Sequence, residues 1–507
     1  MAAKTLMIQG TASAVGKSIL VTALCRIFRQ DGFRVAPFKS QNMALNSFVT
    51  KQGEEMGRAQ AVQAEAAGVE PDIDMNPILI KPEADSKAQV VVLGKPTITL
   101  TAGEYGHYAG ELLPIVTASL ARLRAAYDIV VIEGAGSPSE INLKENEIVN
   151  MRLARLAKAP VLLVGDIDKG GVFASLVGTL TLLDEVDRDS IKGFIINKFR
   201  GDIALLQPGL DYLESYTSKP VIGVVPYYHR ILIPEEDSIF REDEARVEND
   251  GEVINIAVIY LPHLSNSTDF EPLQQEPGVE VQYIRTIDEL SHPDAIILPG
   301  SKSTIADLNY LWSSGLAESI IQQARNGTPL VGICGGFQML GKEIKDPHGI
   351  ESRVDKAAGL NLLNTTTIFQ PQKTTCQVKA QVLSNEGLLE GLSGAEVTGY
   401  EIHMGQTIGN NTRPLFLITH KMNGQTDYID GAVTHDGLTF GSYLHGLFDN
   451  TNFRHAFLSK LRQRKGLSPT PIPPIPARQH QYDKLADIVR RSLNMKLVYQ
   501  IHGLSPM

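Results

Sequence analysis

The N-terminal segment places a glycine-rich loop between an apolar run and an amphipathic stretch, and this limits the possible folds more than any other feature. Residues 6–9 predict a buried strand, and residues 18–30 carry apolar side chains at helical spacing. Strand, glycine loop and helix in this order form a phosphate cradle, because free backbone N–H groups and the helix dipole favour negative charge. The sequence therefore predicts a nucleotide-binding α/β domain. Its predicted binding residues are Gly10, Thr11, Val15, Gly16, Lys17 and Ser18.

Individual side chains of this site have distinct predicted roles with ATP and Mg²⁺. Lys17 is expected to neutralise the terminal phosphates, and the Ser18 hydroxyl to bind Mg²⁺. Glu133 ends the apolar run 129–132 and is expected to be the second protein contact of the metal. Asn197 ends another strand-like run and could contact the adenine edge, although a single asparagine is a weak signal.

Short apolar runs alternate with longer amphipathic stretches through the first two-thirds of the chain. This pattern predicts mainly parallel sheets covered by helices. A chain of 507 residues exceeds the usual size of one core, so we expect several domains. The predicted bounds are 1–235, 252–450 and 451–507, with an acidic stretch at 241–250 marking the first boundary. The third part combines a proline-rich segment at 469–476 with a helix that could dock on the body, and residues 359–443 favour added antiparallel strands.

Cys334 lies between the apolar run 330–333 and a helix-like start at 337–340, with Gly335 and Gly336 directly after it. A thiol at the end of a strand and the beginning of a helix is placed as a nucleophile, because the positive end of a helix favours thiolate over thiol. A small buried core residue is the alternative for an isolated cysteine. His445 follows another apolar run, and a distant cysteine and histidine at two strand ends are typical of a Cys–His catalytic pair.

Composition restricts the class of partner. The formal net charge of −10 disfavours a general nucleic-acid or membrane-surface binder, both of which need a basic surface. Three cysteines without C-x-x-C spacing predict neither a disulfide framework nor a structural zinc site. With no long apolar span and no signal peptide in the sequence, we expect a cytoplasmic enzyme.

A phosphate site and a Cys–His pair on one chain suggest a division of labour. One half would release ammonia from glutamine, and the other would use ATP to activate an acceptor. A carboxylate reacts with ammonia only after one of its oxygens becomes a leaving group, and phosphorylation achieves this. The sequence therefore predicts the ATP-dependent amidation of a carboxylate.

A series of short motifs runs along nearly the whole chain. The motifs are PFKSQNM at 37–43, MGRAQ at 56–60, NPILIKP at 76–82, EGAGSPSEINL at 133–143, DIDKGGVF at 166–173, NKFRGD at 197–202, LPGSKST at 298–304 and GYEIHMG at 399–405. Each motif alone is modest, but their combined order is specific. In this order they resemble the glutamine-hydrolysing cobyric acid synthase family over nearly the whole length of the chain.

The resemblance implies a substrate that spacing alone could not supply. It implies that adenosylcobyrinic acid a,c-diamide is amidated at its b, d, e and g carboxylates to adenosylcobyric acid. It also implies a dethiobiotin synthetase-like N-terminal domain, a class I glutamine amidotransferase domain and a corrinoid whose cobalt is cargo. Repeated amidation of one large ring suggests an open acceptor site, for which a homo-oligomer interface is one option.

The resemblance assigns roles in the second site. Cys334 would attack the glutamine amide, and His445 would act as base and then as acid. Backbone N–H groups of Gly335 and of the turn at Gly300 would hold the oxyanion. Ordinary class I amidotransferases carry glutamate two residues after this histidine, but here that position is Leu447, so the group that orients His445 stays open.

Other positions also leave questions. Residues 39–42 offer no carboxylate where dethiobiotin synthetase relatives carry a metal ligand, and Asp166 and Asp168 could serve the metal or the acceptor. Glu401 and His403 receive no assigned chemistry.

Two alternative functions stay open. One is a cobyrinic acid a,c-diamide synthase-like amidase, and the other is a P-loop ATPase switch with a non-catalytic amidotransferase-like module. The Cys334 and His445 pair disfavours the switch, since a binding module needs neither side chain.

Overall fold

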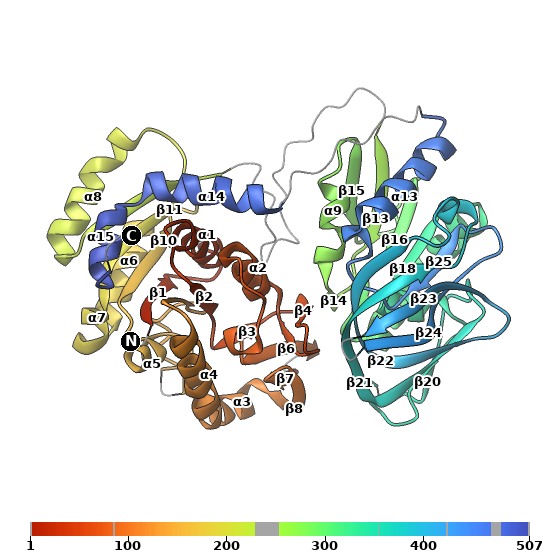
Figure 1. The fold of residues 1–507 in the computed structure, drawn as a ribbon, viewed down its shortest axis with the longest axis horizontal. Helices are drawn as coiled ribbons and strands as arrows, with labels where there is room; N and C mark the ends of the chain where they lie inside the picture. The colour runs from red at the N-terminus through yellow and green to blue at the C-terminus, as the bar shows by residue number, and fades with distance from the viewer. Residues whose placement is uncertain are drawn as a thin grey trace. The chain divides into compact units, whose positions relative to one another are not determined.

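The computed structural model describes residues 3–84, 87–144, 146–228, 253–352, 354–421, 424–467 and 478–504 (Figure 1). The chain forms two compact units. The first comprises Met1–Ala44, Met56–Phe240 and Pro476–Met507, and the second comprises Leu45–Glu55 and Arg241–Ile475. Both the acidic run at 241–250 and the proline-rich run at 469–476 fall outside the described residues. In the described part of the chain, no helix combines the length and apolar character needed to cross a membrane.

The first unit is built on a parallel sheet of six strands. Its strand order is β12-β11-β10-β1-β9-β2. The strands are β1 (Lys4–Gly10), β2 (Val35–Phe38), β9 (Ile129–Glu133), β10 (Val161–Asp166), β11 (Ile191–Phe199) and β12 (Val221–Pro226). Strands β1, β9 and β11 were expected from the apolar runs, and their buried central residues explain why these runs are continuous rather than alternating.

A smaller four-stranded sheet and ten α-helices complete the described part of this unit. The small sheet has the order β3-β6-β7-β8, with β3 (Gln41–Met43), β6 (Ile78–Ala84), β7 (Lys87–Val92) and β8 (Lys95–Thr101). The helices are α1 (Lys17–Gln30), α2 (Arg58–Ala67), α3 (Ala102–Ala109), α4 (Leu113–Ala126), α5 (Met151–Ala157), α6 (Val172–Leu182), α7 (Glu185–Ser190), α8 (Ile203–Thr217), α14 (Arg478–Ser492) and α15 (Met495–Ile501).

The C-terminal helices α14 and α15 belong to the first unit, which differs from the predicted single extension at 451–507. Helix α14 packs along α1, where Tyr482 and Val489 join the core cluster of the parallel sheet. Arg26 Nε also lies 2.7 Å from Asp483 Oδ1. Helix α14 thus docks on the first unit. Its apolar face completes the core around α1, which explains why it lies there.

The second unit has a large mixed sheet whose first half is parallel. Its order is β15-β13-β16-β18-β25-β24-β23-β21-β19-β20, and β22 pairs with β21. The strands are β13 (Ile254–Ile259), β15 (Val279–Ile284), β16 (Ala295–Leu298), β18 (Leu330–Ile333), β19 (Glu343–Lys345), β20 (Lys356–Ala358), β21 (Thr365–Val382), β22 (Glu396–Gly409), β23 (Arg413–Lys421), β24 (Gly424–Val433) and β25 (Thr439–Ser442). Antiparallel pairing of β21 with β22 and β23 confirms the added strands expected at 359–443.

Short strands and helices position the rest of the second unit. Strand β14 (Leu264–Ser265) pairs with β17 (Gly300–Ser301), and β4 (Ser47–Val49) pairs with β5 (Glu55–Gly57). The helices are α9 (Glu271–Gln274), α10 (Thr304–Ser313), α11 (Leu316–Arg325), α12 (Gly335–Leu340) and α13 (Thr451–Arg464). The segment Leu45–Glu55 is a departure from the predicted bounds, because it lies in this unit although its flanks Ala44 and Met56 lie in the first.

Two candidate active sites

The predicted phosphate loop joins the end of β1 to the beginning of α1. Gly16 precedes the helix with φ 95°, a left-handed conformation that only glycine adopts readily. A Cβ on Gly10 would lie 2.5 Å from a Val15 methyl group, so the loop also closes too tightly for a side chain there. The Thr11 N–H donates to the Val164 carbonyl at 2.9 Å and fixes the loop to the neighbouring strand β10.

Lys17 and Ser18 begin helix α1 with their side chains inside the site. Lys17 Nζ donates to the carbonyls of Ala12 at 2.8 Å and Gly136 at 3.1 Å. Ser18 Oγ donates to Glu133 Oε1 at 2.9 Å. The pairing of β1 with β9 places Glu133 beside the phosphate loop, as the sequence predicts.

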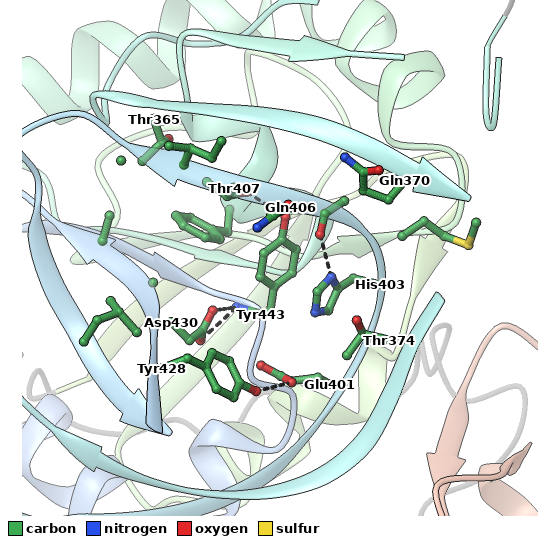
Figure 2. A pocket seen from close by; sticks show the side chains of 18 of the residues that line it. Thr365, Gln370, Thr374, Glu401, His403, Gln406, Thr407, Tyr428, Asp430 and Tyr443 are labelled. Carbon is green, nitrogen blue, oxygen red and sulfur yellow. Dashed lines mark hydrogen bonds between the residues drawn. The ribbon is translucent and has the colours of Figure 1, made fainter. Parts of the chain in front are cut away.

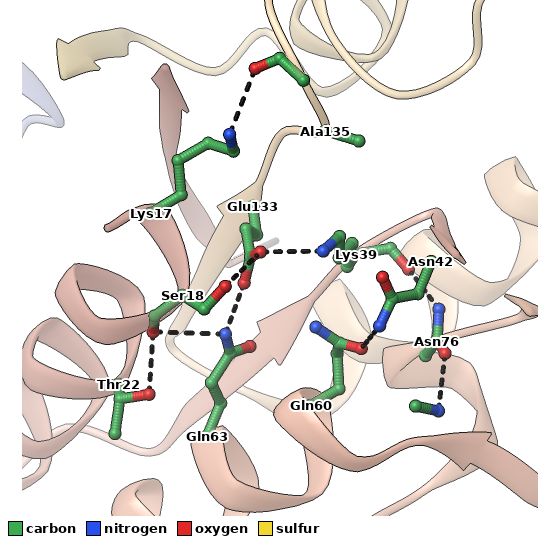
Figure 3. A network of polar contacts seen from close by, with 12 residues as sticks. Lys17, Ser18, Thr22, Lys39, Asn42, Gln60, Gln63, Asn76, Glu133 and Ala135 are labelled. Carbon is green, nitrogen blue, oxygen red and sulfur yellow. Dashed lines mark hydrogen bonds and ion pairs between the residues drawn. The ribbon is translucent and has the colours of Figure 1, made fainter. Parts of the chain in front are cut away.

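A polar network surrounds Glu133 (Figure 3). Lys39 Nζ lies 2.9 Å from Glu133 Oε1, and Gln63 Nε2 donates to Oε2 at 2.5 Å. Burial alone would raise the pKa of Glu133, but the charge of Lys39 and the hydrogen bonds from Lys39, Gln63 and Ser18 outweigh burial and lower it. Glu133 is therefore an anion at neutral pH, and Lys39 balances its charge.

The donor set fits a magnesium ion that is bound mainly through nucleotide phosphates. Ser18 Oγ and Glu133 Oε1 already adjoin each other, and Mg²⁺ commonly uses one or two protein ligands together with phosphates and water. In the part of the chain that the structure describes, no group of three or more His, Cys, Asp or Glu side chains could hold a metal ion by itself. The other two candidate metal ligands, Asp166 and Asp168, form ion pairs with basic side chains instead. Asp166 lies 2.9 Å from Lys198 Nζ, and Asp168 lies 3.1 Å from Arg200 Nε.

The Asn197 side chain contacts the phosphate loop directly. Its Nδ2 donates to the Val15 carbonyl at 2.8 Å, and a Cβ on Gly16 would come within 2.2 Å of the same nitrogen. The Asn197 Oδ1 atom is buried without a hydrogen-bond partner. An unsatisfied buried acceptor is unfavourable unless a ligand supplies the donor.

Cys334 sits at the tip of a strained turn between β18 and α12. Its φ of 53° and ψ of −106° are unusual for a residue with a side chain. Its N–H donates to the Ser442 carbonyl at 2.8 Å, and its Sγ contacts the Ile402 carbonyl at 3.4 Å. The residue is 7% exposed, so the turn holds the thiol at a fixed and nearly buried position.

The parallel pairing of β18 with β25 brings His445 to Cys334. Ile333 and Ser442 are register partners, and His445 follows three residues after Ser442. The buried His445 imidazole lies close enough to Cys334 for the sulfur to raise the pKa of the ring. The ring also stacks on Tyr400, with centroids 5.2 Å apart and an interplanar angle of 16°. The structure therefore brings together the two residues that the sequence pairs.

Asp269 is the partner of His445 that the sequence left open. Its Oδ2 lies 2.7 Å from His445 Nδ1, and its Oδ1 accepts the Gly446 N–H at 2.9 Å. Burial works against the imidazolium, but the Asp269 carboxylate and the Cys334 sulfur together raise the pKa of His445 to about 10. His445 therefore carries a proton at neutral pH. The sequence signal for Asp269 was its position in the polar run that follows β13. The carboxyl ends of the parallel strands β13, β18 and β25 meet at one edge of the sheet, where Cys334 and His445 also lie.

Backbone groups also gather at Cys334. A Cβ on Gly335 would lie 2.8 Å from the Ser301 nitrogen, so these two stretches approach closely. A Cβ on Gly300 would lie 3.2 Å from His445 Cε1. Glycine at both positions lets the β17 turn reach the thiol, which is the arrangement that an oxyanion site requires.

A cavity of about 1050 Å³ lies in the same unit (Figure 2). Phe337, three residues after Cys334, and Tyr443, two before His445, both line it. The His403 ring stacks on Tyr443 at 3.7 Å, and burial lowers the pKa of His403 to about 4. His403 is therefore neutral at pH 7, and the stacked pair forms a wall of the cavity.

Charged side chains in the same cavity include Glu401, Lys421 and Asp430. Glu401 accepts from the Tyr428 hydroxyl at 2.7 Å and lies 3.7 Å from Lys421 Nζ. Burial, with a further contribution from Glu401, raises the pKa of Asp430 to about 7. The cavity is therefore lined by groups of both signs.

The other two cysteines lie in unlike surroundings. Burial, helped by the charge of Glu133, raises the pKa of the Cys25 thiol. Burial and Glu401 raise the pKa of Cys376 to about 12. Among the described residues, Cys334 is the cysteine whose sulfur acts on the pKa of the buried His445.

Comparison with known proteins gives two domain matches and many full-length relatives. Residues 6–238 match the CobQ/CobB/MinD/ParA nucleotide binding domain, and residues 255–453 match the CobB/CobQ-like glutamine amidotransferase domain. A cobyric acid synthase of Dehalococcoides mccartyi strain CBDB1 is 55% identical over 98% of this chain and 99% of its own length. The chain belongs to the cobyric acid synthase family.

Other members of the cobyric acid synthase family match over the same extent. The proteins of Sorangium cellulosum and Desulforamulus reducens are each 52% identical over 99% of this chain, covering 99% and 98% of their own lengths. The N-terminal P-loop domain with its parallel sheet and the class I amidotransferase-like domain are those of a glutamine-hydrolysing amido-ligase. The nucleotide-binding domain implies the use of ATP.

Proposed function

We propose that the protein amidates the b, d, e and g side-chain carboxylates of adenosylcobyrinic acid a,c-diamide with glutamine nitrogen, giving adenosylcobyric acid. The observation that carries this proposal is the presence of a Cys334–His445–Asp269 constellation and a phosphate loop on one chain of this family. The first supplies ammonia, and the second activates the acceptor.

The N-terminal site would phosphorylate the acceptor. A carboxylate oxygen attacks the terminal phosphorus of ATP, ADP leaves, and the product is an acyl phosphate. Lys17 can exchange its carbonyl contacts for phosphate oxygens, and the amides of the loop with the beginning of α1 hold them. Mg²⁺ held by Ser18, Glu133 and the phosphates would supply further positive charge against the charge of the transferred group. The unpartnered Oδ1 of Asn197 supports its assignment to the amino group of adenine.

The C-terminal site would hydrolyse glutamine through a thioester. The Cys334 sulfur attacks the amide carbon, and backbone N–H groups at Gly335 and the Gly300 turn would stabilise the oxyanion. Protonated His445 donates a proton to the departing nitrogen, so ammonia leaves. His445 then removes a proton from water, which attacks the thioester and releases glutamate. Asp269 keeps the imidazole oriented through both steps.

We also propose that glutamine enters through the cavity of the second unit. Its α-ammonium and α-carboxylate groups need opposite charges, and Glu401 and Lys421 offer both in the lining. Phe337 and Tyr443 connect this lining to the two catalytic turns.

Ammonia completes the reaction by attacking the carbonyl carbon of the acyl phosphate. The C–N bond forms, phosphate leaves, and a proton passes to solvent. Each cycle therefore consumes one ATP and one glutamine for each amide formed.

Mass spectrometry of the corrinoid product tests the assignment. The purified chain is incubated with cobyrinic acid a,c-diamide in its adenosyl form, ATP, Mg²⁺ and amide-¹⁵N glutamine. We expect four ¹⁵N-labelled amides for each ring and none without ATP. Amides formed only on cobyrinic acid would instead support the a,c-diamide synthase alternative, and ATP hydrolysis without glutamine use would support the ATPase switch.

Two further expectations remain proposals. We propose a cytoplasmic location, which fits three free cysteines. A homo-oligomer stays a prediction, and light scattering of the purified chain with and without corrinoid measures it.

A further inference from the structure

The segment Leu45–Glu55, here called the excursion, is a part of the N-terminal sequence that lies in the C-terminal unit. Five of its residues are buried: Asn46, Ser47, Val49, Thr50 and Glu55. Asn46 is 5% exposed and Ser47 is not exposed at all. Polar residues in a connecting segment are normally solvated, so their burial requires specific partners.

Those partners include the residues that begin the Asp269 turn. The Ser47 N–H donates to Asn266 Oδ1 at 2.8 Å. Asn46 Oδ1 accepts the Ser267 N–H at 2.9 Å and the Ser267 hydroxyl at 3.2 Å. These reciprocal hydrogen bonds fix the beginning of the short 3-10 helix Ser267–Phe270.

The turn held in this way carries the group that orients His445. Asn266 has φ 55°, a left-handed conformation that costs free energy and persists only when neighbours enforce it. Three residues later, Asp269 contacts His445 Nδ1 at 2.7 Å. The Asn266 amide nitrogen itself lies 3.4 Å from His445 Nε2. The excursion therefore contacts Asn266, which lies beside the imidazole, and Ser267, which begins the 3-10 helix that carries Asp269.

A second contact reaches the other face of the imidazole. The Tyr400 hydroxyl donates to the Ser47 carbonyl at 3.3 Å, and the Tyr400 ring stacks on His445. Val49 packs with Tyr400 and Ile402 in one buried cluster. The excursion thus supports the ring that covers His445 as well as the carboxylate that binds it.

The two ends of the excursion continue into the network around Glu133. Before it, Asn42 Nδ2 donates to Gln60 Oε1 at 2.9 Å. After it, the Gly57 N–H donates to Asn76 Oδ1 at 2.9 Å, and Asn76 Nδ2 donates to the Lys39 carbonyl at 3.0 Å. Lys39 is the ion-pair partner of Glu133 (Figure 3). A change in the position of Lys39 can therefore reach the excursion through the chain itself.

We propose that Asn46 and Ser47 are positioning residues for glutamine hydrolysis, and that the excursion makes its rate depend on occupancy of the phosphate site. The inference rests on the proposed function. Nucleotide that brings Mg²⁺ to Ser18 and Glu133 would change the charge that Lys39 faces, and the excursion would pass the change to Asn266 and Ser267, at the beginning of the turn that carries Asp269. Ammonia released before the acceptor is activated would be lost to water, so this dependence keeps the two reactions in step.

The test uses the full-length chain and Asn46→Ala, which removes the acceptor of the Ser267 N–H. Glutamate release is measured with and without ATP, Mg²⁺ and the corrinoid, over a range of pH. We expect kcat to fall about 10-fold with KM for glutamine unchanged, and the stimulation by ATP to disappear. Because Asp269 is then held less firmly against His445, the alkaline limb of the pH profile should move to lower pH. Amidation with ammonium chloride should stay at the wild-type rate.

Two variants separate positioning from packing. Asn46→Asp keeps the acceptor and should restore most of the rate. Glu54→Ala removes the acceptor of the hydrogen bond that the Thr50 hydroxyl donates within the excursion at 3.0 Å, a contact with neither the Asp269 turn nor Tyr400, and should behave as wild type. Thermal unfolding of all three reports folding.

The positioning role is overturned if Asn46→Ala retains wild-type glutamate release and ATP stimulation. It is equally overturned if Glu54→Ala lowers the rate as much and Asn46→Asp restores nothing. A wild-type chain that forms amides from ammonia but releases no glutamate contradicts the proposed function, and the positioning role falls with it.

Discussion

The two candidate sites differ in how their charges are held before any ligand binds. In the first unit, Lys17 donates to two neutral backbone carbonyls, which it can surrender at modest cost. In the second, His445 is fixed against the Asp269 carboxylate and lies wholly inside the protein. The two sites therefore differ in preorganisation. In the phosphate site, the Lys17 ammonium group can exchange its carbonyl contacts for phosphate oxygens, whereas in the thiol site the His445–Asp269 pair is already formed without a ligand.

Removing the transferable cation should have the largest effect. Lys17→Ala is expected to slow amidation by about 10³-fold or more with either glutamine or ammonia, because charge on the transferred phosphoryl group loses its partner. Product formation is followed by mass spectrometry. Lys192→Ala, which removes an exposed lysine of the same unit, is the control. Near-normal turnover in Lys17→Ala would remove the phosphate site from the mechanism.

Neutralising the Asp269 carboxylate should have a smaller effect, limited to glutamine hydrolysis. Asp269→Asn is expected to lower glutamine hydrolysis by about 10²-fold and to leave ammonia-dependent amidation unchanged. Asp269 raises the pKa of His445, so its loss lowers that pKa from about 10. The protonated form is the acid, so the alkaline limb of kcat/KM should move to lower pH.

A matched variant controls for the loss of a buried carboxylate in general. Glu276→Gln removes one that pairs with Arg454 and His455 elsewhere in the same unit. Its pH profile should stay in place even if its thermal stability falls. An unchanged limb in Asp269→Asn would show that Asp269 does not govern His445.

The smallest effect is expected in the cavity. Glu401→Gln should raise KM for glutamine about 10-fold and leave kcat nearly unchanged, because one charge-assisted contact to the α-ammonium group is lost. Steady-state glutamate release measures both constants. Glu396→Gln, an exposed position on the same strand, should match the wild type. Equal KM values in the two variants would place the glutamine elsewhere.

The sequence predicted both sites because each depends on local features at strand ends. Gly16 and Lys17 follow a strand directly, and Cys334 lies between an apolar run and two glycines. Parallel pairing then determines what lies beside them, which is why Glu133 and His445 were found as well. These predictions needed only the rule that the carboxyl ends of parallel strands meet at one edge.

Asp269 and the excursion were not predicted, because their positions depend on long-range contacts. Asp269 comes after a two-stranded pairing and a left-handed residue, neither of which apolar periodicity reveals. Residues 45–55 follow a family motif without a break in composition, so nothing in their pattern indicates a different unit. Helix α14 was recognised as a docking helix, but its partner α1 is more than 400 residues earlier in the chain. Hydrophobic pattern gives the face of a helix, not the surface that it covers.

The division of labour between the two sites is the central claim, and Cys334→Ala tests it most directly. The measurement is the rate of corrinoid amidation by this variant with glutamine and, separately, with ammonium chloride at saturating ATP. We predict that amidation with glutamine is lost while amidation with ammonia proceeds at the wild-type rate. Loss of both reactions in a variant with unchanged thermal unfolding, or retention of both, would contradict the account.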